Sequence, residues 1–305
     1  MPEEIPADGL PRVLGEGGVQ STSGKPGIRV VTDSAADLDK AVAADHGVGV
    51  VHLDVRLGAF GPEATSSWSP EEFWERSAAV AELPETSAPS PGQFKETFSA
   101  MAEEGAEGIV CITLSSKLSA TYQAAVIGAE SVSDRIPVRV VDSLLATMAE
   151  GLTVLDAVAA AEAGGDLAAV ERVAVASRER ILLFGALESL DNLRKGGRLG
   201  SAQALLGGLL DIKPVLEIRD GALVLESRPR TRSRSFERLT TKVREAGELD
   251  RIAVVHAAAS DVDSFVELLA TLLPKERINV GWLGPVIGAH VGRGTVAVAA
   301  QRRVT

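Results

Sequence analysis

The chain has 305 residues, of which 45% are hydrophobic, and this is enough to bury a sizeable core. Because single cores stop growing near roughly 250–300 residues, we expect two domains. A formal net charge of −11 disfavours generic binding to nucleic acid or to an anionic membrane. Hydrophobic runs fall short of the roughly 20 residues of a membrane span, and MPEEIPADGL is acidic where a signal peptide is basic. We therefore expect a cytoplasmic protein without integral membrane association.

The first 27 residues contain six glycines and four prolines and show almost no apolar periodicity. Such a composition buries too little apolar surface to order a chain. We expect a disordered tail over residues 1–27.

Apolar runs alternate with helical patterns from residue 28 to about 150. The scheme appears first as a β-branched run, a TDS turn, a helical pattern and a second run at 48–51, and again at 109–129. The strand VRVVDS at 138–143 then precedes an alanine-rich helix near 145–163. This alternation predicts an N-terminal α/β domain over 28–150 with a mostly parallel sheet.

The pattern changes beyond about residue 170. Two alternating segments in PVLEIRDGALVLES are joined by Asp220-Gly221, which is the strongest hairpin signal in the chain and predicts antiparallel pairing. The elements that follow are a helix near 234–246, a strand at 251–257, a helix near 261–273 and a last strand around 294–300. We expect a second α/β domain with a mixed sheet over 151–305, with the boundary somewhere in 150–170.

Hydroxyl and carboxyl side chains follow three predicted strands, in TDS at 32–34, SSKLSATY at 115–122 and VDS at 141–143. In open α/β sheets, ligands lie outside the carboxyl ends of the strands. Ser115 or Ser116 can serve as a helix N-cap, but one cap needs only one hydroxyl. The surplus hydroxyls, beside free amides at a helix N-terminus, suit a carboxylate or phosphate.

Two further segments can be interpreted in two ways each. PETSAPSPGQF at 84–94 is either a loop with local turns or a second source of hydroxyls. RPRTRSRSFER has four arginines at alternate positions, which share one face if the stretch stays extended. That face is either a charged strand edge or a contact for phosphate or an acidic partner. Nucleic acid is the weaker fit, because no aromatic residues interleave the arginines.

His290 lies in VIGAHVGRGT, which we expect to form a glycine-flanked turn that brings backbone close to a ligand. A histidine here is either structural or able to exchange protons. The four histidines and the single cysteine, Cys111 in an apolar strand, show no metal-ligand spacing, so we expect no metal or cofactor. Motifs of serine hydrolases, nucleotide-binding loops and zinc proteases are absent from the sequence. A Ser119/His290 nucleophile pair stays open as an alternative.

Taken together, these segments resemble the DegV family of bacterial fatty-acid-binding proteins. The matching segments follow the family's order and cover nearly all of the chain after residue 27. They are VVTDSAADL (30–38), ETSAPSPGQF (85–94), ITLSSKLSATYQAA (112–125), VVDS (140–143), LESLDNLRKGGRLG (187–200), LLDIKPVLEIRDGAL (209–223), RPRTR (228–232) and IGAHVGRG (287–294).

The resemblance implies two α/β domains with a long-chain fatty acid enclosed in an apolar tunnel between them. It also implies that the protein is not itself an enzyme. It presents the carboxyl group to a separate dihydroxyacetone-kinase-like subunit of a fatty acid kinase, which uses ATP to make an acyl phosphate for phospholipid metabolism. Carried over by position, Thr86 and Ser119 would hold the carboxylate. Arg230 and His290 would lie at the tunnel mouth and serve phosphoryl transfer or kinase docking.

The chain departs from the family pattern at two motifs. The family usually has LSGT where this chain has LSAT, so the backbone at Ala120 must tolerate a methyl group. The family's HTGPG is HVGRG here, so Val291 replaces a hydroxyl and Arg293 adds a cation. Three hypotheses remain: a lipid carrier, a stand-alone esterase- or phosphatase-like enzyme using Ser119 or His290, and an interaction module for an acidic partner.

Overall fold

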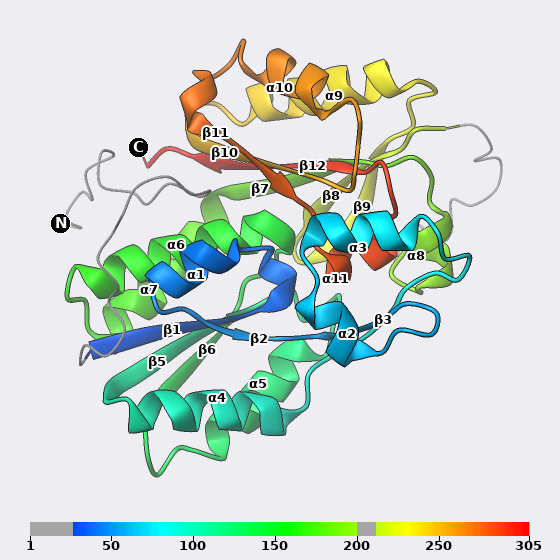
Figure 1. The fold of residues 1–305 in the computed structure, drawn as a ribbon. Helices are drawn as coiled ribbons and strands as arrows, with labels where there is room; N and C mark the ends of the chain where they lie inside the picture. The colour runs from blue at the N-terminus through cyan, green and yellow to red at the C-terminus, as the bar shows by residue number, and fades with distance from the viewer. Residues whose placement is uncertain (1–26, 200–211, 305) are drawn as a thin grey trace.

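The computed structural model describes residues 27–199 and 212–304, which form two main β-sheets and the helices that cover them (Figure 1). The strands are β1 Gly27–Asp33, β2 Gly49–Val51, β3 Asp54–Arg56, β4 Glu85–Ser87, β5 Ala106–Thr113, β6 Val138–Asp142, β7 Ile181–Ala186, β8 Val215–Arg219, β9 Ala222–Ser227, β10 Leu249–His256, β11 Ile278–Trp282 and β12 Val296–Arg302. The helices are α1 Lys40–Asp45, α2 Pro62–Ser67, α3 Pro70–Ser77, α4 Pro91–Glu103, α5 Thr121–Glu130, α6 Thr147–Glu162, α7 Leu167–Arg180, α8 Asp191–Lys195, α9 Arg232–Glu245, α10 Val262–Leu269 and α11 Pro285–Val291.

The first sheet has the strand order β2-β1-β5-β6, and all its pairs are parallel. Its two central strands are apolar runs buried by helices on both faces, as parallel strands require. Cys111 lies on β5 opposite Val31 and is fully buried. The predicted parallel-sheet domain is confirmed.

The second sheet has the order β11-β10-β12-β7-β8-β9. Strands β10 and β11 are parallel and every other pair in this sheet is antiparallel, so the predicted mixed sheet is confirmed. The β8–β9 hairpin turns at Asp220 and Gly221, whose φ angles are 50° and 80°. Two successive positive φ angles are what a tight two-residue hairpin turn demands.

The two sheets and their helices stack in five layers (Figure 1). Helices α4 and α5 cover the outer face of the first sheet, α6 and α7 lie between the two sheets, and α9 and α10 cover the far face of the second sheet. Most of α6 is buried, including its apolar residues on every side, because it packs against both sheets. The chain passes to the second sheet at Ile181, so the boundary expected in 150–170 falls within these shared helices.

Several boundaries differ from the predicted ones. Helix α9 begins at Arg232 because the Thr231 side chain accepts from the Arg234 amide and caps it there. Helix α10 ends at Leu269, four residues before the expected end. The expected tail lies outside the described residues except for Gly27, which begins β1. Within residues 27–199 and 212–304, no helix is long and apolar enough to cross a bilayer.

Candidate functional site

An apolar cavity lies between the second sheet and the strand ends of the first. Its empty space is about 880 Å³, a figure that includes space open to solvent. Its apolar lining residues include Leu53, Ala88, Leu114, Leu118, Ala146, Leu183, Leu187, Leu193, Leu216, Ile218, Leu223, Leu283, Val286, Ile287, Val291 and Ala297. Such a wall suits a hydrocarbon chain.

Polar groups from both halves of the molecule meet at this cavity. Thr86 and His290 both line it, and a hydrogen bond of 2.8 Å joins Thr86 Oγ1 to His290 Nε2. Thr86 is held by β4, where it pairs with Val55 of β3. His290 is in the last turn of α11, which begins with Pro285 at a position where its missing amide costs nothing. The predicted glycine-flanked turn at His290 is therefore wrong, because His290 is helical. The helix ends two residues later at Gly292, where φ is 81°.

His290 is a neutral imidazole at pH 7. Burial, with a smaller contribution from the Arg198 guanidinium, lowers the pKa of His290 to about 4. The imidazole packs against Gly196, where an added Cβ would stand 2.6 Å from Nδ1. This glycine therefore gives the ring room to reach Thr86.

Ser119 lines the same cavity from the loop that follows β5. Its hydroxyl lies 2.9 Å from Thr121 Oγ1 and accepts from the Thr121 amide at 3.4 Å, at the start of α5. The structure thus brings together three of the four site residues expected from the sequence: Thr86, Ser119 and His290.

Arg230 does not join them. It is exposed and lines a separate hollow beside α9 with Arg234 and Arg238, away from the residues that line the cavity. Arg230 is not among the residues that line the cavity, and its position at the mouth stays a prediction. The cation that lines the cavity is Arg198, which follows α8 and to which the sequence analysis gave no role. Arg198 lies within LESLDNLRKGGRLG, one of the segments that resemble DegV proteins, but no local pattern pointed to the cavity.

The expected four-arginine stripe does not form. Helix α9 begins inside the stretch, so the alternate positions no longer share a face. Arg232 turns inward and donates to Asp261 Oδ2 at 2.9 Å and to the Gly294 carbonyl at 2.6 Å. The stretch is therefore partly structural.

The hydroxyls after β5 also have structural tasks. Ser115 is fully buried and donates to the Gly221 carbonyl at 2.7 Å, which docks the β8–β9 hairpin on the first domain. It also accepts from the Lys117 amide. The expected helix N-cap at Ser115 or Ser116 is wrong, because α5 begins only at Thr121.

Comparison with known proteins shows the family of the chain. The family model described as "Uncharacterised protein, DegV family" matches residues 27–303. The chain belongs to the DegV family. A DegV domain-containing protein of Streptomyces coelicolor is 37% identical and covers 90% of this chain and 99% of its own length. Another from Halalkalibacterium halodurans is 32% identical and covers 89% and 97%.

Solved DegV structures share the whole fold. A DegV family protein from Thermus thermophilus, described with its fatty acid binding, has a TM-score of 0.82 at 32% identity and covers 91% of this chain and 100% of its own. DegV from Bacillus subtilis, described as a fatty acid binding protein, has a TM-score of 0.81 at 26% identity and covers 91% and 99%. The α/β fold with one parallel and one mixed sheet is thus the DegV fold.

The departures from the DegV motifs have local explanations. Ala120 has φ at −77°, so the methyl group that replaces glycine causes no strain. Val291 adds an apolar side chain to the cavity wall. Arg293 turns to another helix and donates to the Trp74 carbonyl at 2.7 Å. The added cation therefore serves the fold beside the cavity.

The geometry gives no support to a Ser119/His290 nucleophile. Each of the two side chains is hydrogen bonded to a threonine, Ser119 to Thr121 and His290 to Thr86. A serine nucleophile needs a base within hydrogen-bond reach and a third group to orient that base. In the part of the chain that the structure describes, no group of three or more His, Cys, Asp or Glu side chains is placed to hold a metal.

Proposed function

We propose that this protein binds a long-chain fatty acid in the apolar cavity and presents the carboxylate to a separate kinase subunit. The observation that carries the proposal is the cavity itself, which is lined mostly by apolar residues and has Thr86, Ser119 and His290 among its polar lining residues. Relatives of the same fold from Thermus thermophilus and Bacillus subtilis are described as fatty acid binding.

The free-energy balance favours a lipid over a polar metabolite. At about 0.8 kcal/mol per buried CH₂, about fifteen methylenes gain on the order of 12 kcal/mol before the costs of binding. Burying the carboxylate without partners would forfeit much of this gain. We propose that the Thr86 and Ser119 hydroxyls donate hydrogen bonds to the carboxylate. Neutral His290 would stay hydrogen bonded to Thr86.

We propose that the kinase step belongs to a separate dihydroxyacetone-kinase-like subunit and that the product is an acyl phosphate. His290 would lie beside the reacting carboxylate, while exposed Arg230 would contact the partner from outside the cavity. Because ATP is the phosphate donor, we place the protein in the cytoplasm. In this proposal the protein has no catalytic activity of its own.

Titration with a fluorescent fatty acid tests the proposal. Thr86→Ala combined with Ser119→Ala should weaken binding at least about tenfold, since each hydrogen bond to a charged group is worth roughly 1.5–3 kcal/mol. Ser116→Ala with Thr271→Ala is the matched control, because both side chains are exposed and neither lines the cavity. Equal affinity of the folded double variant and this control would remove the carboxylate role.

The same preparations test presentation to the kinase. With a cognate kinase and ATP, Arg230→Ala should keep its lipid affinity within about tenfold and lose most acyl-phosphate formation. Full kinase-dependent turnover by Arg230→Ala would contradict its role as a partner contact. If the isolated wild type hydrolyses esters and Ser119→Ala does not, the alternative of a stand-alone esterase-like enzyme is favoured instead.

A further inference from the structure

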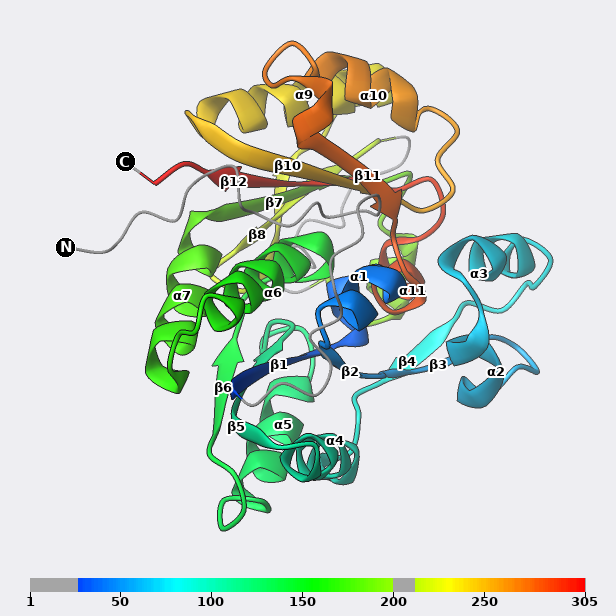
Figure 2. The same ribbon diagram turned by 60° about the vertical axis from the view of Figure 1, so that its left-hand side comes forward.

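Thr86 belongs to a small unit that stands beside the two main sheets. Strands β3 and β4 with helices α2 and α3 form this unit, residues 54–87, which lies to one side of the sheets against α11 (Figure 2). The hydrogen bond between Thr86 and His290 crosses the contact between this unit and α11. Contacts that hold the unit on α11 therefore also hold Thr86 beside His290.

Trp74 of α3 is the anchor of this contact. It is 4% exposed, and its indole Nε1 donates to the Leu283 carbonyl just before α11 at 2.7 Å. Its ring packs against Gly288, where any Cβ would overlap the ring carbon Cζ2. A larger residue at position 288 would therefore push the Trp74 ring away from α11.

Arg293 closes the contact from the other side. Its Nη1 donates to the Trp74 backbone carbonyl at 2.7 Å, across the same boundary. The Trp74 carbonyl belongs to the last turn of α3, where carbonyls point out of the helix and a cation is favoured. Trp74 is thus held at two points. Arg293 donates to its backbone carbonyl, and the Leu283 carbonyl accepts from its side chain.

We infer that Arg293 and Trp74 are positioning residues that seat residues 54–87 on α11 and so hold Thr86 against His290. Neither residue needs to touch the lipid. This inference deepens the proposed function, because it assigns the residues that keep the headgroup site assembled. Loss of either contact should let the unit shift, separate Thr86 from His290 and open one wall of the cavity.

The variants that test this are Arg293→Ala and Trp74→Phe, where phenylalanine keeps an aromatic ring but cannot donate to Leu283. The matched control is Arg76→Ala, which removes an arginine from the same helix. Arg76 is exposed, pairs with Glu72 within α3 and stacks over Trp68, so it does not bridge to α11. Arg293→Lys should rescue Arg293→Ala in part, since lysine keeps both a donor and the charge.

The first readout is the titration of His290 followed by NMR in lipid-free protein. In the wild type the pKa is about 4, with burial as the main cause and Arg198 as the charged group facing the ring. Arg293→Ala and Trp74→Phe should expose the ring and raise its pKa toward the ordinary value of 6.5, while Arg76→Ala should not.

The second readout is the release rate of a fluorescent fatty acid, which should rise about tenfold in Arg293→Ala, equivalent to ~1.4 kcal/mol. Wild-type titration and release in both Arg293→Ala and Trp74→Phe would overturn the inference. The His290 titration needs no lipid, so a raised pKa in a protein that binds no fatty acid would reject the proposed function and keep the inference.

Discussion

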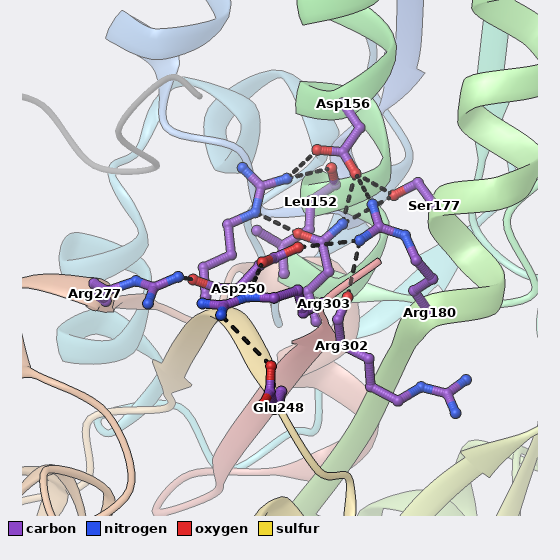
Figure 3. Close-up of polar contacts among 11 residues, drawn as sticks. Leu152, Asp156, Ser177, Arg180, Glu248, Asp250, Arg277, Arg302 and Arg303 are labelled. Carbon is purple, nitrogen blue, oxygen red and sulfur yellow. Dashed lines mark hydrogen bonds and ion pairs between the residues drawn. The ribbon is translucent and has the colours of Figure 1, made fainter. Parts of the chain in front are cut away.

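Helix α6 buries two carboxyl groups in opposite ways. Asp156 faces the second sheet, where it forms an ion pair with Arg251 and accepts from Ser177 and Gln301, each at 2.6 Å (Figure 3). Arg180 of α7 adds a second cation at 3.3 Å. Arg251, Arg180, Ser177 and Gln301 thus all donate to this buried carboxylate.

Glu150, on the same helix, faces the first sheet without a cation. One of its oxygens accepts from Thr32 at 3.0 Å and the other has no partner within the described residues. Asp33 and Asp37 are its acidic neighbours. Burial, together with these carboxylates, holds the pKa of Glu150 well above its usual range, and burial raises the pKa of Asp33 and of Asp37 to about 7.

The difference separates two tasks of the helix. The Asp156 network joins α6 and α7 to β10 and β12 and therefore fastens the two halves of the protein together. The acidic cluster lies behind the cavity wall, since Thr147 lines the cavity and donates to Asp37 at 2.6 Å. Thr147 also has φ at 49°, a strained angle for a β-branched residue at the site.

The largest effect is expected from breaking the paired carboxylate. Arg251→Ala leaves Asp156 buried with a weaker set of partners, so the free energy of unfolding should fall by about 3–5 kcal/mol. Urea denaturation followed by circular dichroism measures this loss.

The control for that variant is Arg135→Ala, which removes an arginine from an exposed pair with Glu103. Exposed pairs are worth about 1 kcal/mol or less, so this change should be small. If both variants lose the same free energy, the Asp156 network does not fasten the two halves.

A smaller change, a gain in the free energy of unfolding, is expected when Glu150 is replaced. Below about pH 3, Asp33, Asp37 and Glu150 are protonated in both the folded and the unfolded chain. As pH rises toward 7 the unfolded chain releases protons that folded Asp33, Asp37 and Glu150 retain, so stability falls over this range. Glu150→Gln removes one such group and can keep the hydrogen bond to Thr32.

We therefore expect Glu150→Gln to match the stability of the wild type near pH 4 and to be the more stable of the two at pH 8, because the unfolded wild type gains free energy by releasing the Glu150 proton. Melting temperatures from pH 4 to 8 measure the slope. An unchanged slope, or a loss of stability at pH 8, would show that Glu150 is not held protonated.

Local sequence patterns predicted the strands and the hairpin, whose formation depends mainly on residues close together in the chain. The parallel strands follow from β-branched runs, and the β8–β9 hairpin follows from Asp220-Gly221. The resemblance to DegV proteins pointed to Thr86 and Ser119 for the carboxylate and to His290 for the mouth, and all three line one cavity.

Features that depend on distant contacts were not predictable in this way. Ser115 has the residue type and position of a helix cap, but its partner is a hairpin turn from the second domain. Arg198 reaches the cavity only because α8 packs against α11, and nothing near it in the chain indicates His290. The arginine stripe failed because a single capping threonine starts α9 two residues earlier than the pattern suggested.

The central claim is that the cavity between the two domains holds a long-chain fatty acid by its buried methylenes and the hydroxyls at one end. Native mass spectrometry of the purified protein tests this claim most directly. We predict that the wild type carries the added mass of a long-chain fatty acid and that the Thr86→Ala, Ser119→Ala double variant carries much less. A wild type of bare protein mass that takes up no added fatty acid would contradict the account.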